Sequence, residues 1–375
     1  MNQVHIAIIE NNIIATNTIR EKLARALVDK GYQVTILTTG SEAGMEQARK
    51  KGFGVIDVKG STQNPFDIFI YMRNLSKALK STGASVCLTF TIRPAIWGNI
   101  VTRRLHIPTI TNITGIGPLF ERDNLAYRAA RTLYKFVLKN TARVFFQNHD
   151  DMGIFVQKGF VDAARAQRIP GSGIDYRYYS PLPARKPDDR FVFLFISRLV
   201  KDKGIMEYVE AARMLKNDLP NATFRVLGPV WQQNLKDNTV SDEELRRWVN
   251  EKIVDYSGET DDVRLHIAAA DCIVLPSYRE GTSNVLLEAS SMERPCITCD
   301  TTGCREIVED GVTGFLCNVQ DAGSLAAAMK RMAGLEQEKR QQMGIKGRQK
   351  VIREYDKQIV IDAYLDAIEK INPEK

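Results

Sequence analysis

The sequence predicts an α/β protein made of two doubly wound, Rossmann-like domains that face each other across a cleft. Its 375 residues exceed what one hydrophobic core usually organises. Short apolar runs alternate along the chain with amphipathic helical segments, and these runs are continuously apolar. Continuous apolar strands are typical of parallel sheets that helices cover on both faces. Such sheets bind ligands at the carboxyl ends of their strands.

The first half repeats a unit of apolar run, turn and amphipathic helix. Its first strand is expected at Val4–Ile9, and its first helix at Thr16–Lys30, closed by Gly31. Further strands are expected at Val34–Leu37, Val55–Val58, Val86–Thr89, Pro108–Thr111 and Val144–Phe146.

A linker is predicted at Ser180–Asp189, where three prolines occur within ten residues. We therefore predict a first domain over residues 1–180, a second over 181–355, and a C-terminal helix over 356–375 that packs back on the first. In the second domain we expect strands at Phe191–Ile196, Thr223–Leu227, Ile253–Asp255, Cys272–Leu275 and Cys296–Cys299, and helices that begin at Lys203, Ser241, Asp261 and Thr282.

Composition excludes several classes of protein. With 44% hydrophobic and 26% charged residues the chain is not of a disordered type, and its six cysteines do not suggest a disulfide framework. Cys296 and Cys299 have metal-site spacing but lie in a strand-like run, where they point to opposite faces, so buried thiols are favoured over a zinc site. No secretory leader and no membrane-spanning run is recognisable, which predicts a cytoplasmic chain with only peripheral membrane contact.

The formal charge of +7 is unevenly distributed. Residues 1–180 carry 24 basic and 13 acidic side chains, a net charge of +11, whereas residues 181–375 carry 28 and 32, a net charge of −4. A basic excess confined to one domain suggests that this domain meets an anionic partner. A nucleic acid, a phosphorylated substrate and a membrane surface are the candidates.

The first chemical feature is a pair of cations after the strand Phe191–Ile196. Arg198 follows the strand, and Lys203 opens the next predicted helix. An arginine and a lysine beside a helix N-terminus, at the mouth of a parallel sheet, suit a diphosphate. A solvated turn with ordinary surface charges is the alternative.

The second feature is the segment from Glu280 to Glu288, after the strand Cys272–Leu275. Backbone N–H groups of Thr282 to Asn284 are expected to be open donors at the start of a helix. Glu288 is expected about two turns into that helix among apolar neighbours, where the two hydroxyls of a ribose would satisfy its carboxylate. The alternative is a carboxylate that caps a helix or pairs with a structural arginine. The polar turn Gly258–Val263 is a weaker candidate for contact with a flat base.

Taken together, Arg198, Lys203, Gly258, Glu280 and Glu288 occur in an order that resembles the donor half of family 4 retaining glycosyltransferases, which have the GT-B fold. The resemblance spans the second domain, and three phrases support it: Ala270–Ser277, Glu280–Ala289 and Gly311–Phe315. In the first half only Ile169–Asp175 resembles the family.

The resemblance implies a role for each of these residues. Arg198 and Lys203 would bind the donor diphosphate and stabilise the departing nucleotide, and Glu280 would lie beside the donor sugar as a third catalytic residue. The residues implied in donor binding are Glu288, Gly281, Thr282, Ser283, Asn284, Thr260 and Asp262. The family needs no metal, so none is expected. The loop Glu10–Thr16 departs from the family because it has no glycine, so phosphate would approach there only through asparagine and threonine side chains.

The basic excess concentrates between Arg93 and Arg143, with nine basic and two acidic residues. A predicted helix over Asn124–Asn140 carries a cationic stripe of Arg128, Arg131, Lys135 and Lys139. A basic amphipathic helix suits an anionic membrane or a diphosphate headgroup, and Asn64–Met72 is a second candidate contact. The acceptor or membrane residues named on this ground are Arg93, Arg128, Arg131 and Lys135, and Thr114 is added because Thr114–Gly117 could supply a flexible loop after the strand Pro108–Thr111. The alternative is a helix that covers the sheet and solvates its charged face.

The function predicted from resemblance and charge is bacterial surface polysaccharide or capsule assembly. A hexosyl or N-acetylhexosaminyl group would move from a nucleotide-sugar, expected to be UDP-linked, to a polyprenyl-diphosphate-linked saccharide. The enzyme would work on the anionic cytoplasmic face of the inner membrane and would bind no nucleic acid. The alternatives are a family 4 transferase with a soluble acceptor and a GT-B nucleotide-sugar epimerase. A dehydrogenase is disfavoured because no GxGxxG follows a strand.

Overall fold

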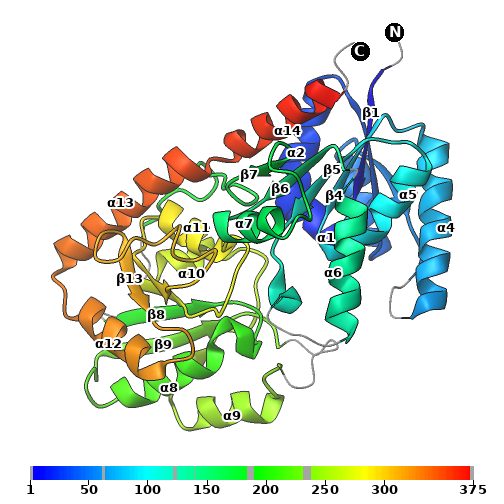
Figure 1. The fold of residues 1–375 in the computed structure, drawn as a ribbon. Coiled ribbons are helices and arrows are strands. Elements are labelled where there is room, and N and C mark those ends of the chain that lie inside the picture. The colour runs from blue at the N-terminus through cyan, green and yellow to red at the C-terminus, as the bar shows by residue number, and fades with distance from the viewer. Residues whose placement is uncertain are drawn as a thin grey trace. The chain divides into compact units, whose positions relative to one another are not determined.

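The computed structural model of the chain describes residues 3–60, 64–120, 125–139, 141–183, 190–230 and 238–371. The chain forms two compact units, one of Met1–Ser172 with Gln358–Lys375 and one of Gly173–Lys357. Each unit is a parallel sheet covered by helices (Figure 1), which confirms the two predicted doubly wound domains. Most of the predicted linker, residues 184–189, lies outside the described residues.

The first unit contains a seven-stranded parallel sheet in the order β3-β2-β1-β4-β5-β6-β7. Its strands are β1 His5–Ile9, β2 Gln33–Thr38, β3 Gly54–Asp57, β4 Val86–Phe90, β5 Thr109–Ile113, β6 Arg143–Phe146 and β7 Ala166–Arg168. The six predicted strands are confirmed to within two residues at each end. Sequence reasoning missed β7, because this half-buried edge strand has no apolar run to reveal it.

Eight α-helices accompany this sheet among the described residues. They are α1 Ile13–Ala15, α2 Glu21–Asp29, α3 Glu42–Lys50, α4 Pro65–Thr82, α5 Asn99–Arg104, α6 Leu125–Leu138, α7 His149–Gln157 and α14 Lys357–Ile371. The prediction of one regular helix over Thr16–Lys30 is wrong at its start, because Thr16–Arg20 forms a wider π-helical turn. Arg20 at its end is buried and reaches the buried Glu10, with 3.4 Å between Nε and Oε2.

Both faces of the first sheet are buried, as the continuous apolar strands predict. On β1, Ile6 and Ile8 pack with α2 and α14, whereas Ala7 and Ile9 pack with α4 on the opposite face. Tyr364 of α14 is fully buried in this unit, where Asn112 donates a 2.8 Å hydrogen bond to its hydroxyl. The last helix of the chain is therefore part of the first unit's core.

The second unit contains a six-stranded parallel sheet in the order β10-β9-β8-β11-β12-β13. Its strands are β8 Phe191–Ile196, β9 Ala222–Leu227, β10 Asp255–Tyr256, β11 Cys272–Leu275, β12 Cys296–Cys299 and β13 Gly314–Cys317. Its helices are α8 Ile205–Leu215, α9 Asp242–Asn250, α10 Arg264–Ala268, α11 Asn284–Ser291, α12 Ala322–Ala333 and α13 Gln337–Tyr355.

Three predicted helix starts in the second unit are too early. Lys203 lies in a short 3₁₀ turn before α8, and α10 and α11 begin after Asp261 and Thr282, because polar turns precede each helix. The strand predicted at Ile253–Asp255 is shifted: Val254 is buried without pairing, and the strand begins at Asp255. Strand β13 was not predicted as a strand.

The strand order of the second sheet reverses between β8 and β11. The chain runs from β8 outward through β9 and β10, then returns to pair β11 with the other side of β8. The loops that follow β8 and β11 therefore leave the sheet in opposite directions from neighbouring strands. In open α/β sheets this switch point is where ligands bind.

Two further findings concern membranes and thiols. Among the described residues, no helix is long and apolar enough to cross a membrane. The six cysteines are buried and free, and the sulfur atoms of Cys299 and Cys317 lie 3.7 Å apart on the paired strands β12 and β13.

Candidate functional site

The switch point of the second sheet brings two predicted catalytic residues into contact. Lys203, after β8, donates from Nζ to Oε1 of Glu280, after β11, at 2.5 Å. Their side chains are only 19% and 14% exposed, so the ion pair is largely withdrawn from water. Because the cation and the carboxylate are partly buried at this edge, their electrostatic interaction with charge that develops on a ligand would be strong.

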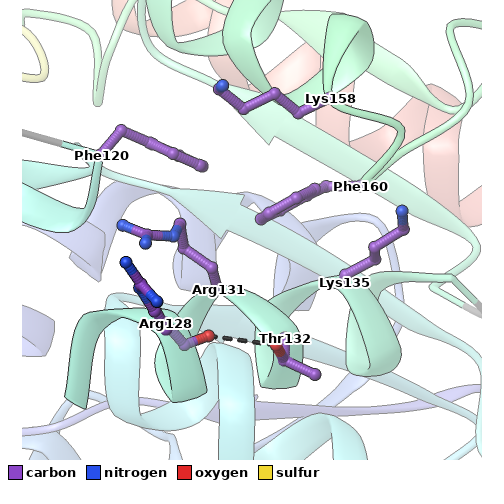
Figure 2. Close-up of a pocket in the computed structure, with 7 residues that line it drawn as sticks. All are labelled: Phe120, Arg128, Arg131, Thr132, Lys135, Lys158 and Phe160. Atoms are coloured by element: carbon purple, nitrogen blue, oxygen red, sulfur yellow. Dashed lines mark hydrogen bonds between the residues drawn. The ribbon is translucent and has the colours of Figure 1, made fainter. Parts of the chain in front are cut away.

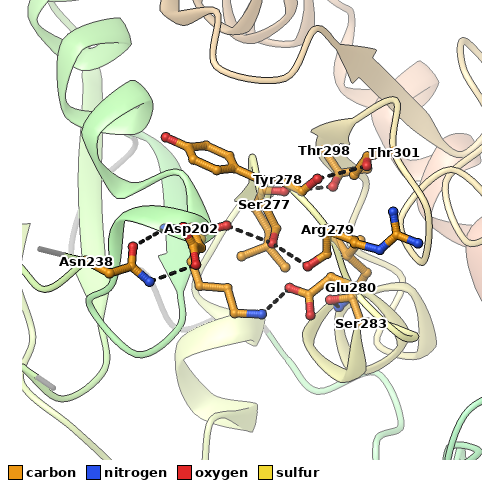
Figure 3. A network of polar contacts seen from close by, with 12 residues as sticks. Asp202, Asn238, Ser277, Tyr278, Arg279, Glu280, Ser283, Thr298 and Thr301 are labelled. Carbon is orange, nitrogen blue, oxygen red and sulfur yellow. Dashed lines mark hydrogen bonds and ion pairs between the residues drawn. The ribbon is translucent and has the colours of Figure 1, made fainter. Parts of the chain in front are cut away.

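Backbone contacts hold the two loops together around this pair, as Figure 3 shows. The carbonyl of Asp202 accepts hydrogen bonds from the backbone N–H of Tyr278 at 2.9 Å and the hydroxyl of Ser277 at 3.2 Å. On the other side, Asn238 donates from Nδ2 to the Asp202 carboxylate at 2.7 Å. Lys203 thus stands on a loop that is fixed from two directions.

Two glycines, one on the loop after β8 and one on the loop after β12, allow close approach to the loop after β11. Gly204 has φ +76°, and a Cβ there would lie 2.0 Å from the carbonyl oxygen of Pro276. Gly303 has φ +79°, and a Cβ there would lie 2.5 Å from the carbonyl oxygen of Glu280. Because side chains disfavour this φ region and the space is filled by backbone, only glycine fits both positions.

The start of α11 corrects one prediction. Ser283 caps the helix, its hydroxyl accepting from the N–H of Leu286 at 3.4 Å, while its own N–H donates to the carbonyl of Gly303 at 3.1 Å. The N–H of Ser283 is therefore not an open donor, because the loop after β12 occupies it. Gly281 and Thr282 lie in the turn before this cap, and Asn284 is the first residue of α11.

Glu288 lies in the second turn of α11, sooner in the helix than predicted. Burial raises the pKa of its carboxyl to about 7, while a hydrogen bond from the Tyr179 hydroxyl and the charge of Lys357 oppose the rise. The partner of Glu288 is thus a tyrosine, and not the cap or arginine considered from the sequence. A carboxyl poised near neutrality can release its proton to accept hydroxyl hydrogen bonds from a ligand.

The turn Gly258–Val263 is organised by its own contacts. The Thr260 hydroxyl accepts from the N–H of Asp262 at 3.1 Å, and the Asp262 carboxylate pairs with Arg264 at 2.6 Å. Hydrogen bonds from Arg264 hold the pKa of Asp262 below its usual range. The Arg264 guanidinium also lies 3.8 Å from the ring centre of Tyr178. The Asp262 carboxylate is therefore already engaged by Arg264, and Thr260 is exposed.

Arg198 lies exposed in the turn directly after β8, on the loop that carries Lys203. Gly228, after β9, approaches this turn so closely that a Cβ would lie 1.9 Å from the carbonyl oxygen of Ser197. The arginine is thus held at the carboxyl edge of the sheet by neighbouring backbone, with its side chain accessible.

The predicted residues of the first unit lie in separate places. Thr114 follows β5. Arg93 follows β4, and its guanidinium lies 5.8 Å from the ring centre of Tyr71. Arg128, Arg131 and Lys135 project from α6, as Figure 2 shows.

The glycine-free loop after β1 uses its amide side chains internally. Asn12 caps α1 by accepting from the N–H of Ile14, and Asn11 donates to the Thr91 hydroxyl at 2.6 Å. The Asn11 and Asn12 side chains thus already bond within the first unit, and are not held open for phosphate.

Sequence reasoning missed Tyr179, Asp202 and Gly303. Tyr179 lies before the predicted linker, so the predicted domain boundary assigned it to the first domain. Asp202 contacts the neighbouring loop through its backbone carbonyl, which no side-chain pattern indicates. Gly303 could have been found from the sequence, because a glycine shortly after a predicted buried strand indicates a tight turn. Among the residues that the structure describes, no group of three or more histidine, cysteine, aspartate or glutamate side chains is placed to hold a metal ion.

Two family profiles match the chain in succession. "Glycosyl transferase 4-like domain" matches residues 16–171, and "Glycosyl transferases group 1" matches residues 183–350, so most of the chain is covered. The second half of the chain is therefore a group 1 glycosyltransferase domain, and the first half is a glycosyltransferase 4-like domain. The second match contains Arg198, Lys203, Glu280 and Glu288, and the resemblance inferred from those residues is confirmed.

Curated relatives agree with this assignment. The glycosyltransferase is 28% identical to "UDP-Gal:alpha-D-GlcNAc-diphosphoundecaprenol alpha-1,3-galactosyltransferase" of Escherichia coli, over 69% of each chain. It is 24% identical to "N,N'-diacetylbacillosaminyl-diphospho-undecaprenol alpha-1,3-N-acetylgalactosaminyltransferase" of Campylobacter jejuni, over 94% of this chain and 95% of the relative. The prediction that the chain is a glycosyltransferase is confirmed.

Solved structures share the fold of this glycosyltransferase. A glycosyltransferase from Rickettsia africae superposes with a TM-score of 0.80 at 16% identity and full coverage of both chains. HepE of Anabaena in complex with UDP-glucose superposes with a TM-score of 0.80 at 16% identity, over 98% of this chain and all of that one. The predicted GT-B fold class is confirmed.

Proposed function

We propose that this glycosyltransferase moves a sugar from a UDP-sugar to a saccharide linked to a polyprenyl diphosphate, with retention at the anomeric carbon. The observation that carries the proposal is the largely buried ion pair of Lys203 and Glu280 at the switch point of the second sheet. The names of the two relatives, which both act on sugars joined to diphosphoundecaprenol, support the acceptor class. Surface polysaccharide assembly at the cytoplasmic face of the inner membrane is the proposed setting.

In this proposal the leaving group is the nucleotide diphosphate. As the bond to the anomeric carbon breaks, its electron pair goes to the β-phosphate, and Lys203 with the accessible Arg198 neutralises the added negative charge. Glu280 holds the Lys203 ammonium in place and presents its second carboxylate oxygen toward the donor sugar. Gly281, Thr282 and Asn284, at the start of α11, line the same edge.

Glu288 is proposed to accept hydrogen bonds from the two ribose hydroxyls. Because its pKa is raised to about 7, binding of UDP should favour the deprotonated form and release a proton near neutrality. The affinity for UDP is therefore expected to fall by about tenfold per unit as the pH drops below about 7. Titration calorimetry between about pH 8 and about pH 6 measures this directly.

The matched variant is Glu288→Gln, which keeps the shape but does not titrate. It should bind UDP about tenfold or more weakly at alkaline pH, and keep only the pH dependence that comes from the terminal phosphate of UDP, whose second pKa is about 6. A wild-type affinity that stays constant across this range, or a Glu288→Gln protein with unchanged affinity, would remove Glu288 from the ribose site.

We further propose that the first unit contacts the membrane peripherally. Exposed apolar side chains occur at the starts of two helices: Phe66 and Phe69 on α4 are 72% and 66% exposed, and Leu125 on α6 is 83% exposed. Both helices begin at the same end of this unit (Figure 1). Apolar side chains beside basic ones suit insertion among anionic headgroups.

Vesicle flotation tests the membrane contact. We expect the wild type to float with vesicles that contain anionic lipid and to stay behind with neutral ones, since basic residues supply about 1 kcal/mol each near an anionic surface. Phe66→Ser with Phe69→Ser should reduce flotation several-fold. The matched exposed apolar control is Met214→Ser on α8 of the second unit. Equal flotation on anionic and neutral vesicles would contradict the proposal.

The overall function is tested by incubating the enzyme with radiolabelled UDP-sugars, a lipid-diphosphate saccharide and a water-soluble saccharide. Transfer of label to the organic phase supports the proposal. Transfer only to a water-soluble saccharide would assign a soluble acceptor. Conversion of the UDP-sugar without any transfer would assign an epimerase.

A further inference from the structure

A cationic hollow lies on α6 of the first unit, whereas the proposed donor residues belong to the second unit. It has a volume of about 530 Å³, in the range of small-molecule sites. Its described lining residues, shown in Figure 2, are Phe120, Arg128, Arg131, Thr132, Lys135, Lys158 and Phe160. Four of these side chains are cationic, and none of the described lining residues is acidic.

Two stretches of chain supply the four cations. Arg128, Arg131 and Lys135 stand on one face of α6 at helical spacing, and Lys158 comes from the end of α7. Arg131 donates to the carbonyl of Leu119 at 2.9 Å, which fixes its guanidinium at the edge of the hollow. The ammonium of Lys158 lies 5.6 Å from the ring centre of Phe120.

The aromatic rings of the hollow pack against the core of the first unit. The rings of Phe120 and Phe160 lie 5.5 Å apart, and each also packs against the fully buried Phe155, at 5.6 Å and 5.3 Å. Because aromatic surface borders the cations on one side, a bound anion would be only partly solvated, and charge-assisted contacts would be stronger than on open surface.

We propose that this hollow binds the diphosphate group of the lipid-linked acceptor. A diphosphate diester carries two adjacent negative charges, and a hollow lined by four cationic side chains can meet both of them. Phe120 and Phe160 then offer an apolar surface to the first isoprene unit. The inference rests on the proposed function, because it is that function which supplies a prenyl diphosphate. It adds a place on this chain where the diphosphate is held.

A binding experiment tests the hollow on the full-length protein. Geranyl diphosphate, geranyl monophosphate, geraniol and inorganic diphosphate are titrated separately, with UDP at saturation so that the donor residues are occupied. Binding of UDP alone is measured first. The test variant is Arg128→Ala with Lys135→Ala, both exposed on α6. The matched control is Arg104→Ala with Lys139→Ala, two exposed cations of the same unit that do not line the hollow.

We expect geranyl diphosphate to bind wild type more tightly than the other three probes. The test variant should weaken this binding by about tenfold or more, and the control by less than about twofold. Equal losses in the test and control variants would show general electrostatic attraction and overturn the proposal. Inorganic diphosphate binding as tightly as geranyl diphosphate would overturn the lipid source.

The two levels of the proposal fail separately. If UDP binds but geranyl diphosphate does not, the inference about the hollow is overturned and the donor assignment stands. If UDP does not bind in the first measurement, the proposed function fails, and binding of geranyl diphosphate still reports on the hollow. Circular dichroism of the double variants shows that both remain folded.

Discussion

Replacing Lys203 with alanine is expected to lower kcat for sugar transfer by about 10²–10³-fold. The ammonium lies 2.5 Å from Oε1 of Glu280, and the Lys203 side chain is largely shielded from water. If it neutralises the departing diphosphate, its loss removes an interaction that strengthens in the transition state, so kcat falls more than KM rises. Initial rates across a range of UDP-sugar concentrations separate the two constants.

The matched control is Lys201→Ala. Lys201 begins the same 3₁₀ turn. Its backbone N–H, and not its side chain, holds the turn in place by donating to the carbonyl of Asn238 at 2.8 Å. Its activity should stay within about twofold of wild type. If Lys203→Ala raised KM while kcat stayed unchanged, Lys203 would bind the ground state only, and the leaving-group role would be wrong.

Replacing Gly204 with alanine should strongly damage the second unit. The new Cβ would lie 2.0 Å from the carbonyl oxygen of Pro276, so the loops after β8 and β11 must separate. Positive φ costs a non-glycine residue about 1–2 kcal/mol, and forced overpacking typically costs about 1–3 kcal/mol more. We expect a clear loss of stability in urea unfolding, and loss of activity because Lys203 moves away from Glu280.

Gly311→Ala separates the two causes. Gly311 has a similar φ of +72°, but a Cβ there would meet nothing within 4 Å. It should lose only the conformational cost, about 1–2 kcal/mol, and keep its activity. If both variants were equally stable and active, the close approach of the two loops would not matter for the site.

The central strands could be predicted because burial on both faces of a sheet requires a continuous run of apolar residues. Phe191–Ile196 is apolar at every position, and the structure buries all but the first of these residues between two layers of helices. Edge strands lack such a run, which is why Ala166–Arg168 escaped prediction. Helix starts were placed too early where a polar turn precedes the helix, as at Thr282 before α11.

The site was only partly readable for a related reason. Lys203 and Glu280 could each be named from the residues around them, since each follows a buried strand. That they form an ion pair depends on β11 pairing with β8, although β9 and β10 intervene in the sequence. The hydrogen bond of Tyr179 to Glu288 likewise joins residues far apart in the chain, and no local pattern announces it.

By itself, the sequence determined the two α/β units and the family, because periodicity and short motifs are local properties. The tertiary structure decided which residues meet: strand order brings Lys203 to Glu280, and backbone approach at Gly204 and Gly303 sets the spacing of their loops. It also turned the basic stripe of α6 into a hollow, because Phe120, Lys158 and Phe160 come from other segments of the chain. Contacts of this kind depend on packing between distant segments, which a linear pattern does not encode.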